Sequence, residues 1–262
     1  MRTETRNLWD NSVGMCEKVP TMTAYFPEEK RSKSAILIFP GGAYENLADH
    51  EGDKYAKFLA ENGYISFVVN YRVSPNRFPL PLLDARRAIR TVKHCSERVG
   101  IDKVGVMGSS AGGHLAALTS TYFKPIDFEN TDDIDKEDIF PDFQILCYPV
   151  ISLFGKGLTH IGSAKNLLGE KALEKCEELS PNLIVNEKTP PAFIWHTFAD
   201  NVVNVRNSIL YASSLRDLKI KTELHIFPDG EHGLGLSKGE SKEHIHVSQW
   251  NKLLLNWLKY ID

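Results

Sequence analysis

The sequence lacks an excess of positive charge. Its 31 Lys and Arg residues are outnumbered by 34 Asp and Glu residues, which gives a formal net charge of −3. Proteins that bind nucleic acid or anionic membranes through electrostatics present a basic field to them. We therefore expect neither nucleic acid nor a membrane as a partner, and a small, uncharged molecule as the ligand.

Long apolar runs and paired cysteines are also missing. No stretch approaches the roughly 20 apolar residues of a membrane-spanning helix, and residues 1–10 are too polar for a secretory signal. The four cysteines form no CxxC pair and show no metal-ligand spacing. Cys95 and Cys147 lie in apolar patterns, so we expect both to be buried free thiols. These absences predict a cytoplasmic protein without a metal site.

Apolar runs typical of strands alternate with helical patterns along the whole chain. This alternation predicts βαβ units, and therefore an α/β fold whose mostly parallel, twisted sheet has helices on both faces. A length of 262 residues suits one such domain over residues 1–262. The predicted strands are 35–39, 65–71, 103–107, 143–150, 192–197 and 222–227, and the predicted helices are 53–62, 82–98, 205–218 and 243–260.

Two longer segments interrupt the alternation. Residues 123–141 are acidic and rich in turn formers, and residues 152–191 contain a helical pattern at 165–178. Long insertions in compact domains often act as lids or binding loops. A plain surface role without function remains an equal alternative for each.

The strongest local motif is G-x-S-x-G at residues 108–112, with Ser110 at its centre. An apolar strand pattern precedes it and a run of helix formers follows it. This strand, tight turn and helix is the setting in which a nucleophilic serine is held on a sharp bend. The alternative is a turn that merely caps a helix. Ser109 would be the nucleophile only if the turn shifted by one residue, which would lose the glycine framing.

A serine nucleophile requires a histidine base and an acid that orients it. His232 lies in a flexible loop directly after the last predicted strand, and His196, at the end of the preceding strand, is the nearest rival. Asp200 is the only carboxylate in residues 198–201, which follow that preceding strand. We expect Asp200 to accept the Nδ1–H of His232, although capping the next helix is its alternative role.

Acyl transfer also needs N–H groups that stabilise the developing oxyanion. The loop after the first core strand reads Pro-Gly-Gly-Ala-Tyr at residues 40–44. We expect Gly42 and Ala43 of this loop, together with Ala111 after the nucleophile, to donate these N–H groups. A simple glycine turn is the alternative for residues 40–44.

Taken together, these motifs resemble the α/β-hydrolase superfamily, and within it the small carbohydrate-esterase and acetylxylan-esterase-like group related to hormone-sensitive lipase. The residues that carry the resemblance are 40–44, 50–52, 70–73, 108–114, 196–208 and 230–233. The resemblance implies a serine esterase without a cofactor, acting on short acyl esters, often acetyl groups on xylose-type sugars. Pro40 and Ala43 depart from the related H-G-G-G pattern, so a preference for longer acyl chains does not carry over.

Tyr44, Glu51, Tyr71 and Arg72 are candidates to line the sugar site, with packing or structural hydrogen bonding an equal alternative for each. Two other functions stay open at this stage. A peptidase would use the same triad, although the chain has little room for the additional gating domain that such enzymes carry. A non-catalytic binding module on this fold would typically lack a triad member, whereas all three are present here. The oligomeric state is left open.

Overall fold

A computed structural model describes residues 1–9, 19–126, 132–169 and 176–262. Its centre is an eight-stranded sheet with the order β1-β2-β4-β3-β5-β6-β7-β8. The six strands β3 to β8 run parallel, while β1 and β2 extend the sheet with antiparallel pairing. The strands are β1 Arg2–Asn7, β2 Thr21–Phe26, β3 Ser34–Phe39, β4 Ile65–Asn70, β5 Lys103–Ser109, β6 Phe143–Cys147, β7 Ala192–Thr197 and β8 Thr222–Phe227.

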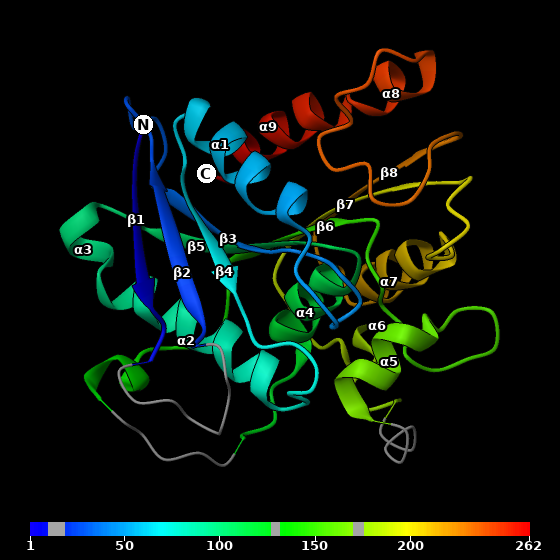
Figure 1. Cartoon of the computed structure of the whole chain (residues 1–262), viewed down its shortest axis with the longest axis horizontal. Helices are drawn as coiled ribbons and strands as arrows, with labels where there is room; N and C mark the ends of the chain where they lie inside the picture. The colour runs from blue at the N-terminus through cyan, green and yellow to red at the C-terminus, as the bar shows by residue number, and fades with distance from the viewer. Residues whose placement is uncertain (10–18, 127–131, 170–175) are drawn as a thin grey trace.

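Helices cover both faces of this sheet, as the alternation in the sequence predicts (Figure 1). The α-helices are α1 Asp53–Glu61, α2 Leu80–His94, α3 Ser96–Val99, α4 Ser110–Thr121, α5 Ile161–Leu168, α6 Pro181–Ile184, α7 Arg206–Asp217, α8 Lys242–Val247 and α9 Trp250–Ile261. Two short 3₁₀ helices, η1 Asp49–Glu51 and η2 Asp133–Lys136, lie in the connections. The predicted fold class, a mostly parallel α/β sheet, is confirmed. Within the described residues, no helix is long and apolar enough to cross a bilayer.

Each face of the sheet buries its own apolar cluster because side chains alternate along a strand. Leu37 of β3 packs in the cluster beneath α2, α4 and α7, whereas its neighbours Ile36 and Ile38 pack beneath α1 and α9. Figure 1 shows these two helical layers on opposite sides of the strands. Strands buried on both faces read as continuous apolar runs, which is why β3 to β7 were predictable.

The sequence does not reveal β1 and β2 in the same way. Every residue of β1 is exposed, so the strand carries no hydrophobic periodicity, and it pairs only with β2. Its side-chain contacts include a hydrogen bond between Thr5 and Thr23 on the exposed face. Because the pairing is made by backbone groups, the composition of β1 gives little sign of it.

The predicted helix over 243–260 is two helices in the structure. The regular α-helical hydrogen bonds are interrupted after Val247. There the N–H groups of Gln249, Asn251 and Lys252 donate to carbonyls three residues back instead of four. Ile245, which the pattern places on the apolar face, is 58% exposed. The tighter bonds change the direction of the apolar stripe, so that α8 buries only Val247, whereas α9 buries Trp250, Leu254, Trp257 and Leu258.

The helical pattern at 165–178 is only partly described. Helix α5 begins earlier, at Ile161, and ends at Leu168, with Gly169 in a conformation of positive φ (78°) as its C-cap. Residues 170–175 lie outside the described residues, as does Cys16. Cys147 is buried as expected, whereas Cys95 at the end of α2 is only partly buried.

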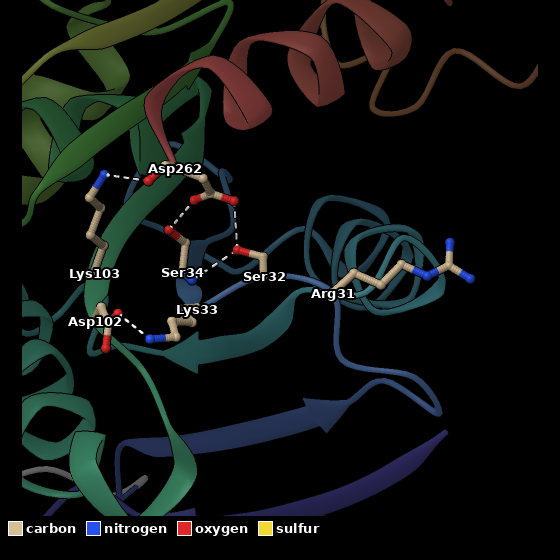
Figure 2. Close-up of a pocket in the computed structure, with 7 residues that line it drawn as sticks. All are labelled: Arg31, Ser32, Lys33, Ser34, Asp102, Lys103 and Asp262. Atoms are coloured by element: carbon tan, nitrogen blue, oxygen red, sulfur yellow. Dashed lines mark hydrogen bonds and ion pairs between the residues drawn. The ribbon is translucent and has the colours of Figure 1, made fainter.

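Four loops at one edge of the sheet come from the carboxyl ends of parallel strands. They are the glycine loop (residues 40–44) after β3, the turn at Ser110 after β5, the aspartate loop (198–205) after β7 and the histidine loop (228–237) after β8. Ligand sites of open α/β sheets form at this edge. At the opposite edge, where β3 and β5 begin, a shallow hollow holds Asp262 against Ser32 and Ser34 (Figure 2).

One buried ion pair connects the end of β4 to α2. Asp84 is fully buried and accepts hydrogen bonds from the backbone N–H, Nε and Nη2 of Arg72 and from Nε1 of Trp9. Burial raises the pKa of Asp84 above its usual value, and the contacts with Arg72 oppose that shift. A charge that is buried in this way depends on its partner.

We expect Asp84→Ala to lower the free energy of unfolding by about 3–5 kcal/mol, because it leaves the Arg72 guanidinium buried without its counter-charge. Urea denaturation followed by circular dichroism measures the loss. The control is Asp102→Asn, which removes an exposed pair with Lys33 and should change the same quantity by less than about 1 kcal/mol. Equal effects in the two variants would contradict a structural role for the Arg72–Asp84 pair.

Candidate active site

Ser110 is the first residue of α4 and lies on the sharp turn that directly follows β5. Its backbone φ is +52°, in the left-handed region that non-glycine residues rarely adopt. The turn needs small neighbours, because a Cβ on Gly108 would lie 2.1 Å from the carbonyl oxygen of Gly112, and one on Gly112 would lie 2.0 Å from that of Phe39. Strand and helix therefore cross too closely for larger residues, as the G-x-S-x-G spacing predicts.

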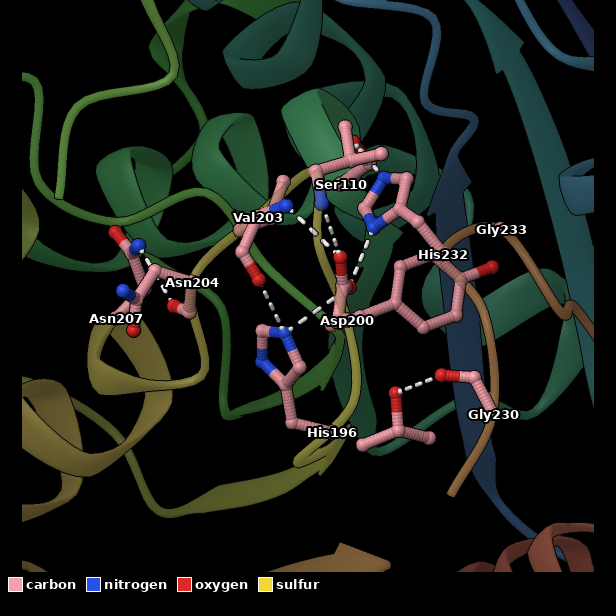
Figure 3. Close-up of polar contacts among 12 residues, drawn as sticks. Ser110, His196, Asp200, Val203, Asn204, Asn207, Gly230, His232 and Gly233 are labelled. Atoms are coloured by element: carbon pink, nitrogen blue, oxygen red, sulfur yellow. Dashed lines mark hydrogen bonds and ion pairs between the residues drawn. The ribbon is translucent and has the colours of Figure 1, made fainter. Parts of the chain in front are cut away.

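His232 lies between Ser110 and Asp200 (Figure 3). Its Nε2 is 2.9 Å from the Ser110 hydroxyl, and its Nδ1 is 2.6 Å from Oδ2 of Asp200. Since an ionised carboxylate only accepts hydrogen bonds, Nδ1 carries a proton and the neutral ring accepts the serine hydroxyl proton at Nε2. The structure thus brings together the three residues that sequence analysis selected from three separate loops.

Asp200 is held in one orientation by several donors. Its Oδ1 accepts the N–H groups of Val202 and Val203, both at 2.9 Å, while Oδ2 accepts from His232 and from Nε2 of His196. Burial alone would favour the neutral acid, but the hydrogen bonds from His196 and His232 outweigh it and hold the pKa of Asp200 well below its usual value. The carboxylate is therefore ionised at neutral pH.

His196, the rival base, lies on the far side of Asp200 from His232 (Figure 3). It is fully buried, and its Nε2 faces both Asp200 and the carbonyl of Val203, which is 3.0 Å away. A carbonyl can only accept, so Nε2 carries the proton and Nδ1 accepts from the hydroxyl of Ser208 at 2.8 Å. This ring orients the aspartate and has no hydrogen bond to Ser110.

The glycine loop lies directly against the nucleophile. A Cβ added to Gly41 would be 3.1 Å from Cβ of Ser110. Gly42 and Ala43 both have positive φ, 120° and 55°, and in the described part of the chain their N–H groups donate to no protein acceptor. The N–H of Ala111, in the first turn of α4, has no intrahelical partner. These are the three N–H groups expected to meet an oxyanion.

The second insertion, residues 152–191, approaches this site at two points. Nδ2 of Asn166 in α5 donates to the carbonyl of Ala43 at 2.9 Å, which fixes the glycine loop from outside. The side chain of Asn207 accepts the N–H groups of Ile151 and Ser152 and so ties the start of the insertion to α7. At the beginning of α5, burial lowers the pKa of His160, and nearby His232 lowers it further.

The four residues considered for a sugar site are buried and bonded within the protein. Their exposed fractions are 0% for Tyr44, 3% for Glu51, 2% for Tyr71 and 4% for Arg72. The Tyr44 hydroxyl contacts Nδ1 of His114 at 2.8 Å, and the Tyr71 hydroxyl donates to the carbonyl of Pro40 at 2.6 Å. Arg72 bonds to Asp84, and Glu51 bonds to Gly41 and Tyr148. Their positions favour the structural alternative over contact with a sugar.

Three residues around the site were not predicted from the sequence in their observed roles: His196 as a partner of Asp200, and Tyr148 and Asn166 as neighbours of the reacting groups. The ring of Tyr148 stands edge-on to that of His232, with 5.1 Å between the ring centroids. One signal was available for Tyr148, because it directly follows β6 between the strands that carry Ser110 and Asp200. Asn166 had no such signal, because it lies inside the second insertion, 123 positions away from Ala43 in the sequence.

Known proteins resemble this chain in sequence and in fold. The sequence matches the BD-FAE family over residues 22–215. It is 35% identical over 245 residues to endo-1,4-beta-xylanase B of Butyrivibrio fibrisolvens, covering 89% of this chain and 38% of that protein. It is 33% identical over 248 residues to an acetylxylan esterase of Xylanibacter ruminicola, covering 92% of this chain and 48% of that protein. The chain thus spans half or less of the length of these two relatives.

A solved structure agrees over nearly the full chain. The acetyl ester-xyloside bifunctional hydrolase from Caldicellulosiruptor lactoaceticus superimposes with a TM-score of 0.90 at 41% sequence identity. The match covers 98% of this chain and 96% of that one. With the family match over most of its length and this shared fold, the chain belongs to the BD-FAE family of α/β-hydrolases.

Proposed function

We propose that this protein is a serine esterase that removes short acyl groups, acetyl above all, from esters of xylose-type sugars. The observation that carries the proposal is the continuous series of hydrogen bonds from Asp200 through His232 to the Ser110 hydroxyl. Beside it lie the N–H groups of Gly42, Ala43 and Ala111, which have no acceptor among the residues that the structure describes. A nucleophile, a base, an orienting acid and donors for an oxyanion are the components of acyl transfer.

In the first step the Ser110 oxygen attacks the ester carbonyl while Nε2 of His232 takes the hydroxyl proton. The carbonyl oxygen becomes an oxyanion that accepts hydrogen bonds from the glycine loop and from Ala111. Asp200 stabilises the imidazolium that forms and keeps the ring in place. When the tetrahedral intermediate collapses, His232 protonates the departing alcohol and the acyl group remains on Ser110.

In the second step His232 removes a proton from water, which attacks the acyl-enzyme. A second oxyanion forms in the same set of N–H groups, and its collapse releases the acid and restores the Ser110 hydroxyl. Besides the ester and water, both steps use only groups of this chain.

The substrate class rests on two kinds of support. Relatives in the comparisons carry the names acetylxylan esterase and acetyl ester-xyloside hydrolase. In addition, only 8% of Ser110 is exposed, and the glycine loop packs against it. Restricted access to the nucleophile favours a small acyl group over a long chain.

Ser110→Ala should lower kcat for p-nitrophenyl acetate by about 10⁴-fold, because no other group can form the acyl-enzyme. Steady-state kinetics of the purified variant measure this. The matched control is Ser120→Ala, which removes another buried serine hydroxyl of α4, one that donates to the carbonyl of Ala116. The control should keep kcat within about twofold of the wild type. Normal turnover by Ser110→Ala would rule out the proposed nucleophile.

Asp200→Asn should reduce kcat by about 10⁴-fold with little change in KM, because an amide in place of the carboxylate favours the wrong imidazole tautomer. The low pKa of Asp200 keeps this carboxylate ionised as the pH falls towards 5, so its protonation does not set the acid limb of the wild-type profile. Kinetics from pH 5 to 9 test this point. Recovery of full activity by Asp200→Asn at any pH in that range would contradict the role of the acid.

Acetylated xylo-oligosaccharides should be deacetylated, and kcat/KM for p-nitrophenyl esters should fall from acetate to octanoate, because Ser110 is poorly accessible. Acetate release and p-nitrophenol absorbance measure the two series. Aminoacyl p-nitroanilides, which probe the peptidase alternative, should be turned over at least about 10²-fold more slowly than the acetyl ester. Preference for the anilides or for octanoate would contradict the proposed substrate class.

A further inference from the structure

A buried carboxylate that takes no part in the acyl-transfer steps lies behind the glycine loop. Glu51, the last residue of η1, is 3% exposed. Its Oε2 accepts the N–H of Gly41 at 2.8 Å, and its Oε1 accepts the hydroxyl of Tyr148 at 2.7 Å. Among the ion-pair contacts of the described residues, its partner is Nε2 of His50, 3.8 Å away, in a ring that is charged only when protonated. Hydrogen bonds from neutral donors therefore provide most of the solvation of this carboxylate.

Tyr148 extends this contact to the histidine loop. Its hydroxyl oxygen accepts the N–H of Gly235 at 3.1 Å, while its ring packs edge-on against His232. The backbone of Tyr148 has a φ of +36° and its N–H donates to the carbonyl of Trp195. The phenol is thus fixed at both ends, and it connects Glu51 to the loop that carries the base.

The same hydroxyl also connects to the nucleophile turn. Ser109, the neighbour of Ser110, donates its hydroxyl to the Tyr55 oxygen at 3.1 Å, and the Tyr55 hydroxyl lies 3.3 Å from that of Tyr148. A carboxylate can only accept hydrogen bonds, so Tyr148 donates its hydroxyl proton to Glu51. Tyr55 then donates to Tyr148, and Ser109 donates to Tyr55, so the three hydroxyls form a row that points towards Glu51. Hydrogen bonds that share one direction strengthen one another.

A second contact from η1 runs in parallel. Nε2 of His50 bonds to the carbonyl of Gly233 in the histidine loop at 2.9 Å. The contacts of Glu51 therefore differ from those of Asp84, whose partners Arg72 and Trp9 include no residue of these loops. Each hydrogen-bond path from Glu51 ends in a segment that carries a reacting group or an oxyanion donor.

We propose that Glu51 is a positioning residue, whose carboxylate holds the glycine loop and, through Tyr148, the histidine loop in register around Ser110. The inference rests on the proposed function, because it assigns a role within the same site. Gly41 immediately precedes the expected oxyanion donors Gly42 and Ala43, so a shift of its N–H moves theirs. A misplacement of about 1 Å costs roughly 10²-fold in rate, and loss of one oxyanion donor costs about 10²–10³-fold.

Two variants cut this network at different bonds. Glu51→Gln keeps the size of the side chain and can still accept from Gly41, but its amide group then points a donor at Tyr148 and reverses the row of hydroxyls. Tyr148→Phe keeps the ring against His232, removes the hydroxyl, and leaves the Gly235 N–H without an acceptor. Both disturb the same connection, so the double variant should lose less activity than the product of the single losses.

The matched control is Tyr211→Phe. The Tyr211 hydroxyl is fully buried and donates to Oε1 of Gln144 at 3.0 Å, in the core between α7 and β6. Its removal should lower the melting temperature about as much as Tyr148→Phe does, while kcat stays within about twofold of the wild type. The control separates loss of a buried hydrogen bond from loss of positioning.

Kinetics with p-nitrophenyl acetate, inhibition by a trifluoromethyl ketone and melting temperature test the role together. We expect kcat to fall about 10–100-fold in Glu51→Gln and about 10-fold in Tyr148→Phe, with KM within about threefold. Inhibition should weaken in proportion to kcat/KM, because the bound ketone forms an oxyanion.

A purely structural role predicts a lower melting temperature with unchanged kcat, and that result would overturn the inference. If Glu51→Gln does not fold, Tyr148→Phe decides, and a kcat within twofold of the wild type overturns it. The outcome is separable from the proposed function. If Ser110→Ala is active, both the proposed function and the positioning role are wrong. If Ser110→Ala is inactive but the Glu51 and Tyr148 variants keep full activity, only the positioning role is wrong.

Discussion

The left-handed turn at Ser110 is the constraint on which the rest of the structure depends. A φ of +52° directs the hydroxyl away from the sheet at the end of β5, and it is possible only because glycine at 108 and 112 lets strand and helix cross in close contact. Such backbone conformations are unfavourable for L-residues and persist where the surroundings hold them. Here the sheet supplies that support, since β5 is paired on both sides by β3 and β6. The glycine, aspartate and histidine loops are arranged around the Ser110 hydroxyl, whose position the turn determines.

Asp84, Asp200 and Glu51, three of the buried carboxylates, are stabilised in different ways, and the differences match their surroundings. Asp84 has a guanidinium partner and joins two elements of the scaffold. Asp200 has two imidazoles and two backbone N–H groups, which keep it ionised beside the ring of His232. Glu51 has one N–H and one hydroxyl, both from loops of the site. A buried charge requires such partners, so each carboxylate fixes the groups around it.

The central part of this fold was predictable because buried strands leave a clear pattern. The bounds of β7 and β8 agree with the prediction, and the glycines around Ser110 gave the turn. The antiparallel edge of the sheet was not predicted from the sequence, because β1 is exposed along its whole length. Within the site, motif residues could be chosen by loop order along the sheet. The residues that support these motif residues could not be chosen in this way. Glu51, for example, contacts Tyr148 across 97 positions of the sequence, and its burial depends on tertiary packing. For the same reason Tyr44 and Tyr71 looked like candidates for ligand contact, whereas the structure encloses both.

We propose that His232 activates the Ser110 hydroxyl, which lies beside the N–H groups of Gly42, Ala43 and Ala111. The most direct measurement is to treat the protein with a fluorophosphonate, digest it, and locate the phosphonyl adduct by peptide mass spectrometry. The account predicts one adduct, on Ser110, whose formation is abolished by substituting His232. An adduct on Ser109 or another residue, or ester hydrolysis that continues without any adduct, would contradict it.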